Sequence, residues 1–114
     1  MQMMCSEVDN ALVVTVKDHR IDAAVAVRFK DNMMELTSHP SERVILDMSN
    51  VEFLDSSGLG AVVGSMKQLG RERKLELAAL TPAVEKVFRI TRMDRVFDIF
   101  EDVETALSGA ADAT

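Results

Sequence analysis

The chain has 114 residues, of which 47% are hydrophobic and 28% are charged, a balance typical of one compact domain. Its net charge of −6 and its aromatic content of 4%, without Trp or Tyr, argue against nucleic acid as a direct partner. Cys5 is the only cysteine, and no apolar run approaches the roughly 18 residues of a membrane span. We therefore expect a cytoplasmic protein without membrane insertion.

The first third of the chain predicts a hairpin followed by a helix. Two β-prone stretches, Met3–Val8 and Ala11–Val16, are separated by Asp9-Asn10, a pair that tolerates the left-handed conformations of a tight turn. Apolar residues then recur at helical spacing from Asp22 to Leu36. Asp22 is placed where a side chain can cap the first turn of that helix.

The middle of the chain predicts a buried strand and a second helix. Arg43–Met48 contains adjacent apolar residues, as does a central strand that is covered on both faces. The short connector Val51–Leu54 follows. A further helix is predicted from Ser57 to Leu69, with its end near Gly70.

The last third predicts a strand and a helix, then another strand and helix. Leu75–Ala79 alternates as a half-buried strand should, with Glu76 on the polar side. Thr81 and Pro82 supply a cap and a first-position proline for the third helix. A last strand is expected within Val96–Phe100.

The end of the chain predicts a short helix and a tail. Asp102 can cap this final helix, and the small, polar segment Ser108–Thr114 is expected to fray. We place one domain at residues 1–109 and a flexible tail at 110–114. The basic run Arg71–Lys74 is interrupted by a glutamate and is interpreted as a solvated loop without a binding role.

The alternation of strands and helices predicts an α/β domain whose central strands are parallel. In such sheets the loops that follow the strands meet at one edge, where ligands and partners bind. Three loops should share this edge. They carry Asp22, the segment Asp55-Ser56-Ser57-Gly58, and Thr81-Pro82.

The segment Asp55-Ser56-Ser57-Gly58 is, as local chemistry, the start of a helix. Asp55 or Ser56 can accept hydrogen bonds from first-turn amides that lack a helical partner. Glycine allows close approach of another group, and a helix N-terminus favours negative charge. The motif therefore predicts a capped helix start that would also tolerate a phosphoryl group.

The longer segment Arg43–Gly60 resembles the signature of the STAS domain, which is found in anti-sigma factor antagonists. Arg20–Ala24 and Thr81–Val84 also look like the turns into the family's first and third helices. The sequence departs from the family pattern at His19 and near Arg92, where glycines are common. The resemblance implies a mixed sheet of four or five strands flanked by about four helices.

The resemblance also implies a phosphorylation switch. The unphosphorylated form would bind an anti-sigma factor with serine kinase activity and so free a sigma factor. Phosphorylation of Ser56, or alternatively of Ser57, would abolish binding, and a serine phosphatase would restore it. The residues implied in partner binding are Asp22, Asp55, Ser56, Ser57, Gly58 and Thr81. An alternative role is an accessory or scaffold subunit of a membrane transport or stress-signalling complex.

Catalysis and metal binding are not expected. A serine nucleophile needs a base, but His19 and His39 lie in separate polar loops with no acidic partner fixed by spacing. Cys5 and the two histidines show no paired ligand spacing. We therefore predict that the protein is not an enzyme and binds no metal or cofactor.

Overall fold

The centre of the molecule is a five-stranded sheet in which only the first strand is antiparallel to its neighbour. The computed structural model describes residues 1–112. The strands are β1 (Met3–Val8), β2 (Ala11–Val16), β4 (Arg43–Asp47), β6 (Lys74–Ala78) and β7 (Ile99–Phe100), in the order β1-β2-β4-β6-β7. The pairs from β2 to β7 are all parallel. The predicted mixed sheet, hairpin and central strand are confirmed.

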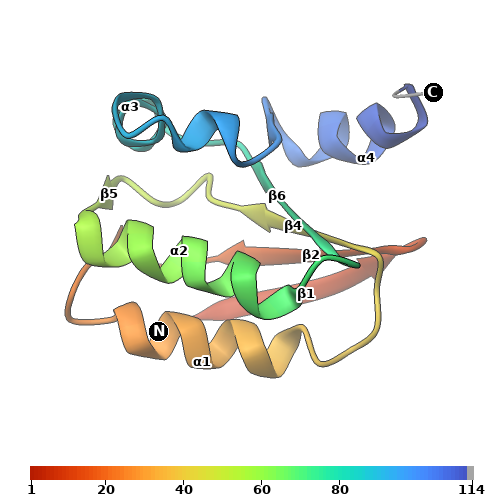
Figure 1. Ribbon diagram of the computed structural model, residues 1–114, viewed down its shortest axis with the longest axis horizontal. Coiled ribbons are helices and arrows are strands. Elements are labelled where there is room, and N and C mark those ends of the chain that lie inside the picture. Colours follow the sequence, from red (N-terminus) through yellow and green to blue (C-terminus); the bar gives the residue numbers. More distant parts are fainter. Residues whose placement is uncertain (113–114) are drawn as a thin grey trace.

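Helices cover both faces of this sheet. They are α1 (Ala26–Leu36), α2 (Ser56–Leu69), α3 (Pro82–Ile90) and α4 (Val103–Asp112), with the short 3₁₀ helix η1 (Met93–Arg95) after α3. Figure 1 shows α1 and α2 on one side of the strands and α3 and α4 on the other. The α/β architecture with four flanking helices is the one predicted.

The core has two parts because alternate residues of each strand point to opposite faces. On the side of α1 and α2, Leu12, Val14 and Val16 of β2 are buried with Phe29 and Met33 of α1. On the other side, Ala11, Val13, Ile45 and Ala78 pack with Ala106 of α4. Because both faces are covered, β2 is apolar except at Thr15, and β4 is apolar in its three central residues.

The expected solvent face of β6 is buried, and this prediction was wrong. Glu76 is only 5% exposed because α4 covers that face of the sheet. Its carboxylate accepts a hydrogen bond of 2.8 Å from Nε of Arg43, on the neighbouring strand β4. Arg43 also donates to the carbonyl oxygen of Ala106 at 2.8 Å. The ion pair therefore ties α4 to the two central strands.

Two short strands were not predicted. β3 (Arg20–Ile21) pairs in parallel with β5 (Phe53–Leu54), which lies inside the expected connector. The same segment corrects the start of the first helix. Asp22 Oδ1 accepts from the amide of Ala24 at 3.1 Å, so this side chain closes a turn and does not cap α1, which begins at Ala26.

The end of α1 is held by Arg73, which corrects its interpretation as part of a solvated loop. The guanidinium donates to the carbonyl oxygens of Thr37 at 2.6 Å, His39 at 3.1 Å and Ser41 at 2.8 Å. Thr37 is the C-cap residue that follows α1. Arg73 therefore satisfies unpaired backbone carbonyls of the segment that leads from α1 into β4.

Two further predictions concern the ends of α3. Pro82 opens this helix as predicted, but the Thr81 hydroxyl does not cap it, because that hydroxyl donates to the carbonyl oxygen of Val51 at 2.7 Å. Beyond the helix, Arg92 has a φ of 62°. This left-handed conformation favours glycine, the residue common near this position in the family pattern.

Asp102 caps α4, as predicted. Its backbone carbonyl accepts from Ala106, and its carboxylate accepts from the amide of Thr105 at 2.6 Å. α4 continues to Asp112, so the predicted domain boundary at residue 109 falls within this helix. Residues 113 and 114 of the predicted tail lie outside the described residues.

We expect the cap at Asp102 to make α4 sensitive to acid. Hydrogen bonds from the Thr105 side chain, and then from its amide, hold the pKa of Asp102 below its ordinary value. A lowered folded-state pKa stabilises the fold above the unfolded value of about 3.9, and this contribution disappears as pH falls through the folded pKa.

Thermal unfolding of Asp102→Ala and wild type at pH 7 and near pH 3 measures this contribution. Asp102→Ala should melt below wild type at pH 7, and the difference should narrow in acid. Asp102→Asn is the matched control because asparagine also caps helices well without a charge. Equal melting temperatures for wild type and Asp102→Ala at pH 7 would contradict the role of the cap.

Candidate functional site

The start of α2 is joined to the loop before α1 by one carboxylate. Asp55 occupies the cap position of α2, and its Oδ1 accepts from the amide of Gly58 at 2.8 Å. Its Oδ2 accepts from the amide of Ala23 at 3.1 Å. Of the two caps considered from sequence, Asp55 is therefore the one used. It also fixes the position of the loop that contains Asp22.

Gly58 makes this close packing possible. A Cβ atom on this residue would lie 2.0 Å from the carbonyl oxygen of Ile21 and 2.8 Å from a side-chain carbon of Leu54. Both neighbours belong to the small β3–β5 pair. The glycine is required here because the first turn of α2 lies directly against the backbone of β3.

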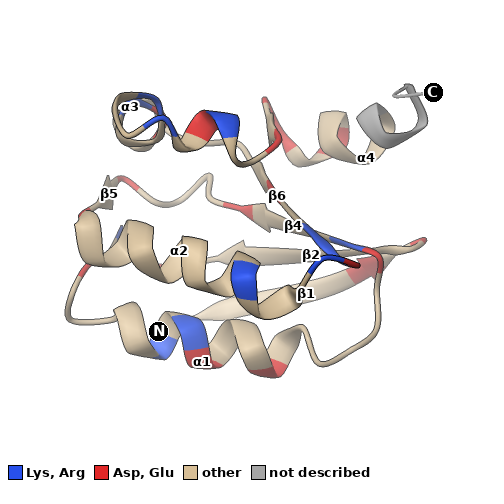
Figure 2. Cartoon of the chain, in the orientation of Figure 1, with Lys and Arg blue, Asp and Glu red and all other residues tan. Residues whose placement is uncertain are grey.

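Ser56 and Ser57 form the exposed beginning of α2. Within the described part of the chain, neither hydroxyl forms a hydrogen bond to a protein group. The first turn of α2 contains no acidic residue, and its one basic residue near the other end is Lys67. Figure 2 shows that the helix is uncharged from its first residue to that lysine. The serine hydroxyls are therefore exposed at the positive end of a helix dipole.

An exposed aromatic group beside the serines was missed by the sequence reasoning. Phe53 is 41% exposed, and the guanidinium carbon of Arg20 lies 4.2 Å from the centre of its ring. Arg20 Nε is also 3.2 Å from Oδ2 of Asp22. Alternation and helical periodicity could not reveal this group because β3 and β5 each have only two residues. The Arg20 guanidinium lies over the Phe53 ring across the paired strands β3 and β5.

The other predicted site residue, Thr81, lies at the same end of the sheet but takes no part in the hydrogen bonds of Asp55. Its hydroxyl holds Val51, in the segment before β5, and α3 packs on β5. Figure 1 shows α3, β5 and the start of α2 together at the left end of the molecule. Thr81 can therefore contribute to a surface that includes the serines, without a direct bond to them.

The side chain of each histidine pairs with a glutamate. His19 Nδ1 is 3.2 Å from Glu52, and His39 Nε2 is 2.6 Å from Glu7. Neither ring is hydrogen-bonded to Ser56 or Ser57 within residues 1–112. In that range there is also no group of three or more potential metal-binding side chains, and no helix is long and apolar enough to cross a membrane.

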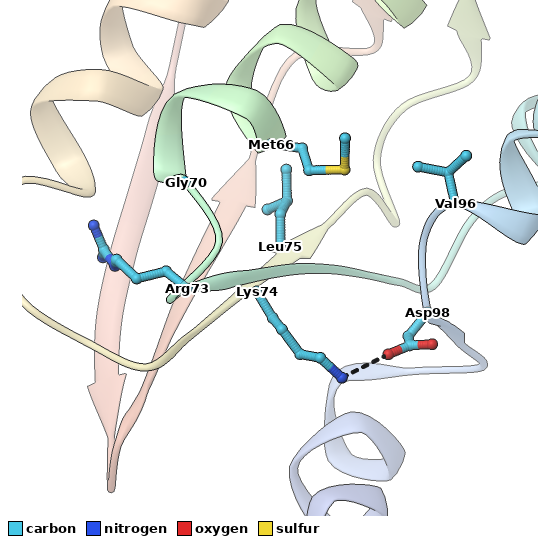
Figure 3. Close-up of a pocket in the computed structure, with 7 residues that line it drawn as sticks. All are labelled: Met66, Gly70, Arg73, Lys74, Leu75, Val96 and Asp98. Carbon is cyan, nitrogen blue, oxygen red and sulfur yellow. Dashed lines mark hydrogen bonds and ion pairs between the residues drawn. The ribbon is translucent and has the colours of Figure 1, made fainter.

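A hollow at the opposite end of the sheet is too small to be a convincing ligand site. Met66, Leu75 and Val96 form its apolar part, and Nζ of Lys74 lies 3.3 Å from Asp98 at the rim (Figure 3). Its volume is about 210 Å³. Ligand pockets usually enclose about 300–1,000 Å³. This hollow is therefore smaller than a usual ligand pocket.

Comparison with known proteins identifies the family of the chain. The family model of the STAS domain matches residues 2–106. The anti-sigma-F factor antagonist RsfB of Mycobacterium tuberculosis is 24% identical over 110 residues, which cover 88% of this chain and 90% of the relative. The anti-sigma-B factor antagonist of Listeria monocytogenes is 30% identical over 90 residues, with 78% of each chain covered.

A solved structure shows the same fold. The crystal structure of an anti-sigma factor antagonist from Mycobacterium paratuberculosis superposes with a TM-score of 0.85 at 25% identity. The match covers 95% of this chain and 92% of that chain. The order of strands, the loop at Asp55 and the match to the family model over residues 2–106 lead to one conclusion. The chain belongs to the STAS domain family.

Proposed function

We propose that the protein is an anti-sigma factor antagonist that works in the cytoplasm as a phosphorylation switch. Its unphosphorylated form binds an anti-sigma factor with serine kinase activity, and this binding frees a sigma factor. The observation that supports the proposal is the exposure of Ser56, with its hydroxyl unbonded, on a helix start that Asp55 holds in place. The names of the similar proteins give the class of partner.

Phosphorylation of Ser56 would change the docking surface and leave the fold in place. The hydroxyl takes part in no hydrogen bond of the described chain, so its modification removes no stabilising contact. The phosphate adds about −1.5 to −2 charge at neutral pH beside Asp55, and the helix start offsets part of the repulsion. A partner that covers this surface would have to remove water from that charge, which opposes binding.

The docking surface in this proposal includes the residues around the serines. Asp22, Asp55, Ser57 and Gly58 shape its centre, and Thr81 lies at its rim. Phe53 adds an exposed ring that the partner can cover, and aromatic residues often contribute strongly to binding. A serine phosphatase would return the surface to its binding form.

We expect Ser56→Asp to weaken binding to the partner kinase by about tenfold, because one added negative charge at an interface costs on the order of 1 kcal/mol or more. Titration calorimetry with the purified anti-sigma factor measures this change. Ser56→Ala should bind like wild type and should no longer be phosphorylated. Ser57→Ala is the matched control, because it should still be phosphorylated if Ser56 is the acceptor.

Peptide mapping after incubation with the kinase and magnesium-ATP identifies the modified serine. Phosphate on Ser57 alone would move the switch to the alternative residue, and unchanged binding of Ser56→Asp would contradict the proposal.

Pull-down from membrane and soluble fractions tests the alternative role, that of an accessory or scaffold subunit. Recovery of a membrane transport complex in place of a soluble kinase would favour an accessory subunit.

A further inference from the structure

The free edge of β1 has the features of a strand that can accept another strand. β1 is the first strand in the sheet order, so its outer side has no neighbour within residues 1–112. Its residues from Met4 to Glu7 are exposed, and the side chain of Met4 is 61% exposed. Of the features with which proteins usually protect such edges, β1 contains no proline, lysine or bulge, and Glu7 is its one charged residue.

The hydrogen bonds of the hairpin show which backbone groups point outward. Lys17 N–H donates to the carbonyl oxygen of Gln2 at 2.9 Å, so this opposite pair is hydrogen-bonded. Bonded and non-bonded pairs alternate along an antiparallel ladder. Met4 and Ser6 therefore turn their backbone groups toward β2, and Met3, Cys5 and Glu7 turn theirs outward. Among the described residues, these outward groups have no protein partner.

We propose that β1 pairs with β1 of a second copy of this chain, antiparallel, about a two-fold axis at Cys5. In this register Cys5 lies opposite Cys5 of the other copy, and Met3 lies opposite Glu7. Each outward residue of β1 then both donates and accepts a hydrogen bond. A two-fold axis requires the two strands to be antiparallel, so each copy contributes the same surface.

The distribution of charge favours this register over its neighbours. With the axis at Cys5, the two Glu7 residues are four positions apart, about 13 Å at 3.3 Å per residue. Their repulsion is then largely screened at physiological salt. Moving the axis to Ser6 would halve this separation and place Asp9 opposite Met3. Moving it to Met4 would leave Glu7 without a partner in β1. Only the register at Cys5 uses the whole outward edge.

Amide hydrogen exchange of the intact protein, at micromolar and millimolar concentrations, tests the pairing directly. The amides of Met3, Cys5 and Glu7 should become protected by about tenfold or more as concentration rises, because they are bonded only in the dimer. The amides of Met4 and Ser6, already bonded to β2, should be protected at both concentrations. A monomer at millimolar concentration, or unprotected outward amides in a dimer, would overturn the proposal.

Two variants locate the interface by sedimentation equilibrium. Cys5→Pro removes an outward N–H that β2 does not use, so it should abolish dimerisation and leave the hairpin intact, as circular dichroism can check. Cys5→Ser keeps the N–H and should dimerise like wild type. If Cys5→Pro dimerises as strongly as wild type, the interface lies elsewhere and the proposal is wrong. The exchange measurement on wild type decides the case if Cys5→Pro does not fold.

Cross-linking through Cys5 also tests the register of the two β1 strands. In the proposed dimer the two Cys5 residues form a hydrogen-bonded pair with Cα atoms about 5.5 Å apart, and their side chains are farther apart than a disulfide prefers. A short bis-maleimide should therefore give a covalent dimer, as each thiol adds across one maleimide double bond. Cys5→Ser should give none. A wild-type dimer that cannot be linked would overturn the register at Cys5. This inference does not depend on the proposed switch.

Discussion

Replacement of Gly58 by alanine is expected to destabilise the fold by about 3 kcal/mol, the upper part of the usual range for an overpacked site. The added Cβ would lie 2.0 Å from the carbonyl oxygen of Ile21, and this backbone atom cannot rotate away. Relief requires α2 to move away from β3. That movement would break the hydrogen bond between Asp55 and Ala23, so partner binding should weaken together with stability.

Gly60→Ala is the matched control because it adds the same methyl group to the same helix. No atom lies within 4 Å of a Cβ at this position. Alanine favours a helix over glycine by about 0.5–1 kcal/mol, so Gly60→Ala should be neutral or more stable than wild type. Urea unfolding of both variants measures the difference. Equal stability of Gly58→Ala and Gly60→Ala would contradict the close packing of α2 on β3.

The larger elements of the fold could be predicted from sequence because each repeats its pattern over several residues. The hairpin, the central strand and the start of α2 are confirmed in this way. The two-residue strands β3 and β5 show no period, so their pairing could not be anticipated. The prediction that Glu76 is exposed was wrong for a different reason. Its position alternates as an exposed residue should, but α4, from a distant part of the chain, covers it.

The candidate site likewise has features that local sequence predicts and features that depend on the tertiary fold. The cap at Asp55 is local chemistry, and the four residues of its motif narrowed the choice to Asp55 or Ser56. Its second bond, to Ala23, joins segments 32 residues apart and depends on the tertiary fold. Phe53 and Arg20 meet through the unpredicted strands. The sequence therefore predicted the loop that we propose as functional, and the structure shows which hydrogen bonds hold it and what surrounds it.

We expect Glu76→Ala to lower the free energy of unfolding by about 3 kcal/mol, the cost of leaving one member of a buried ion pair without its partner. The side chains of Arg43 and Glu76 are 12% and 6% exposed, so water can replace little of the lost interaction. The Arg43 guanidinium also holds Ala106 of α4, and loss of its carboxylate partner should loosen that helix. Urea unfolding, with hydrogen exchange in α4, measures both effects.

The exposed pair Glu85–Arg89 provides the comparison, because its side chains are 57% and 61% exposed and its partners are 3.5 Å apart. Glu85→Ala should change stability by no more than about 0.5 kcal/mol. The double variant Arg43→Met with Glu76→Leu should be more stable than Glu76→Ala, since an apolar pair leaves no charge unpaired. If Glu76→Ala were as mild as Glu85→Ala, water would have to reach Arg43, and α4 could not be closed over β6 as the structure has it.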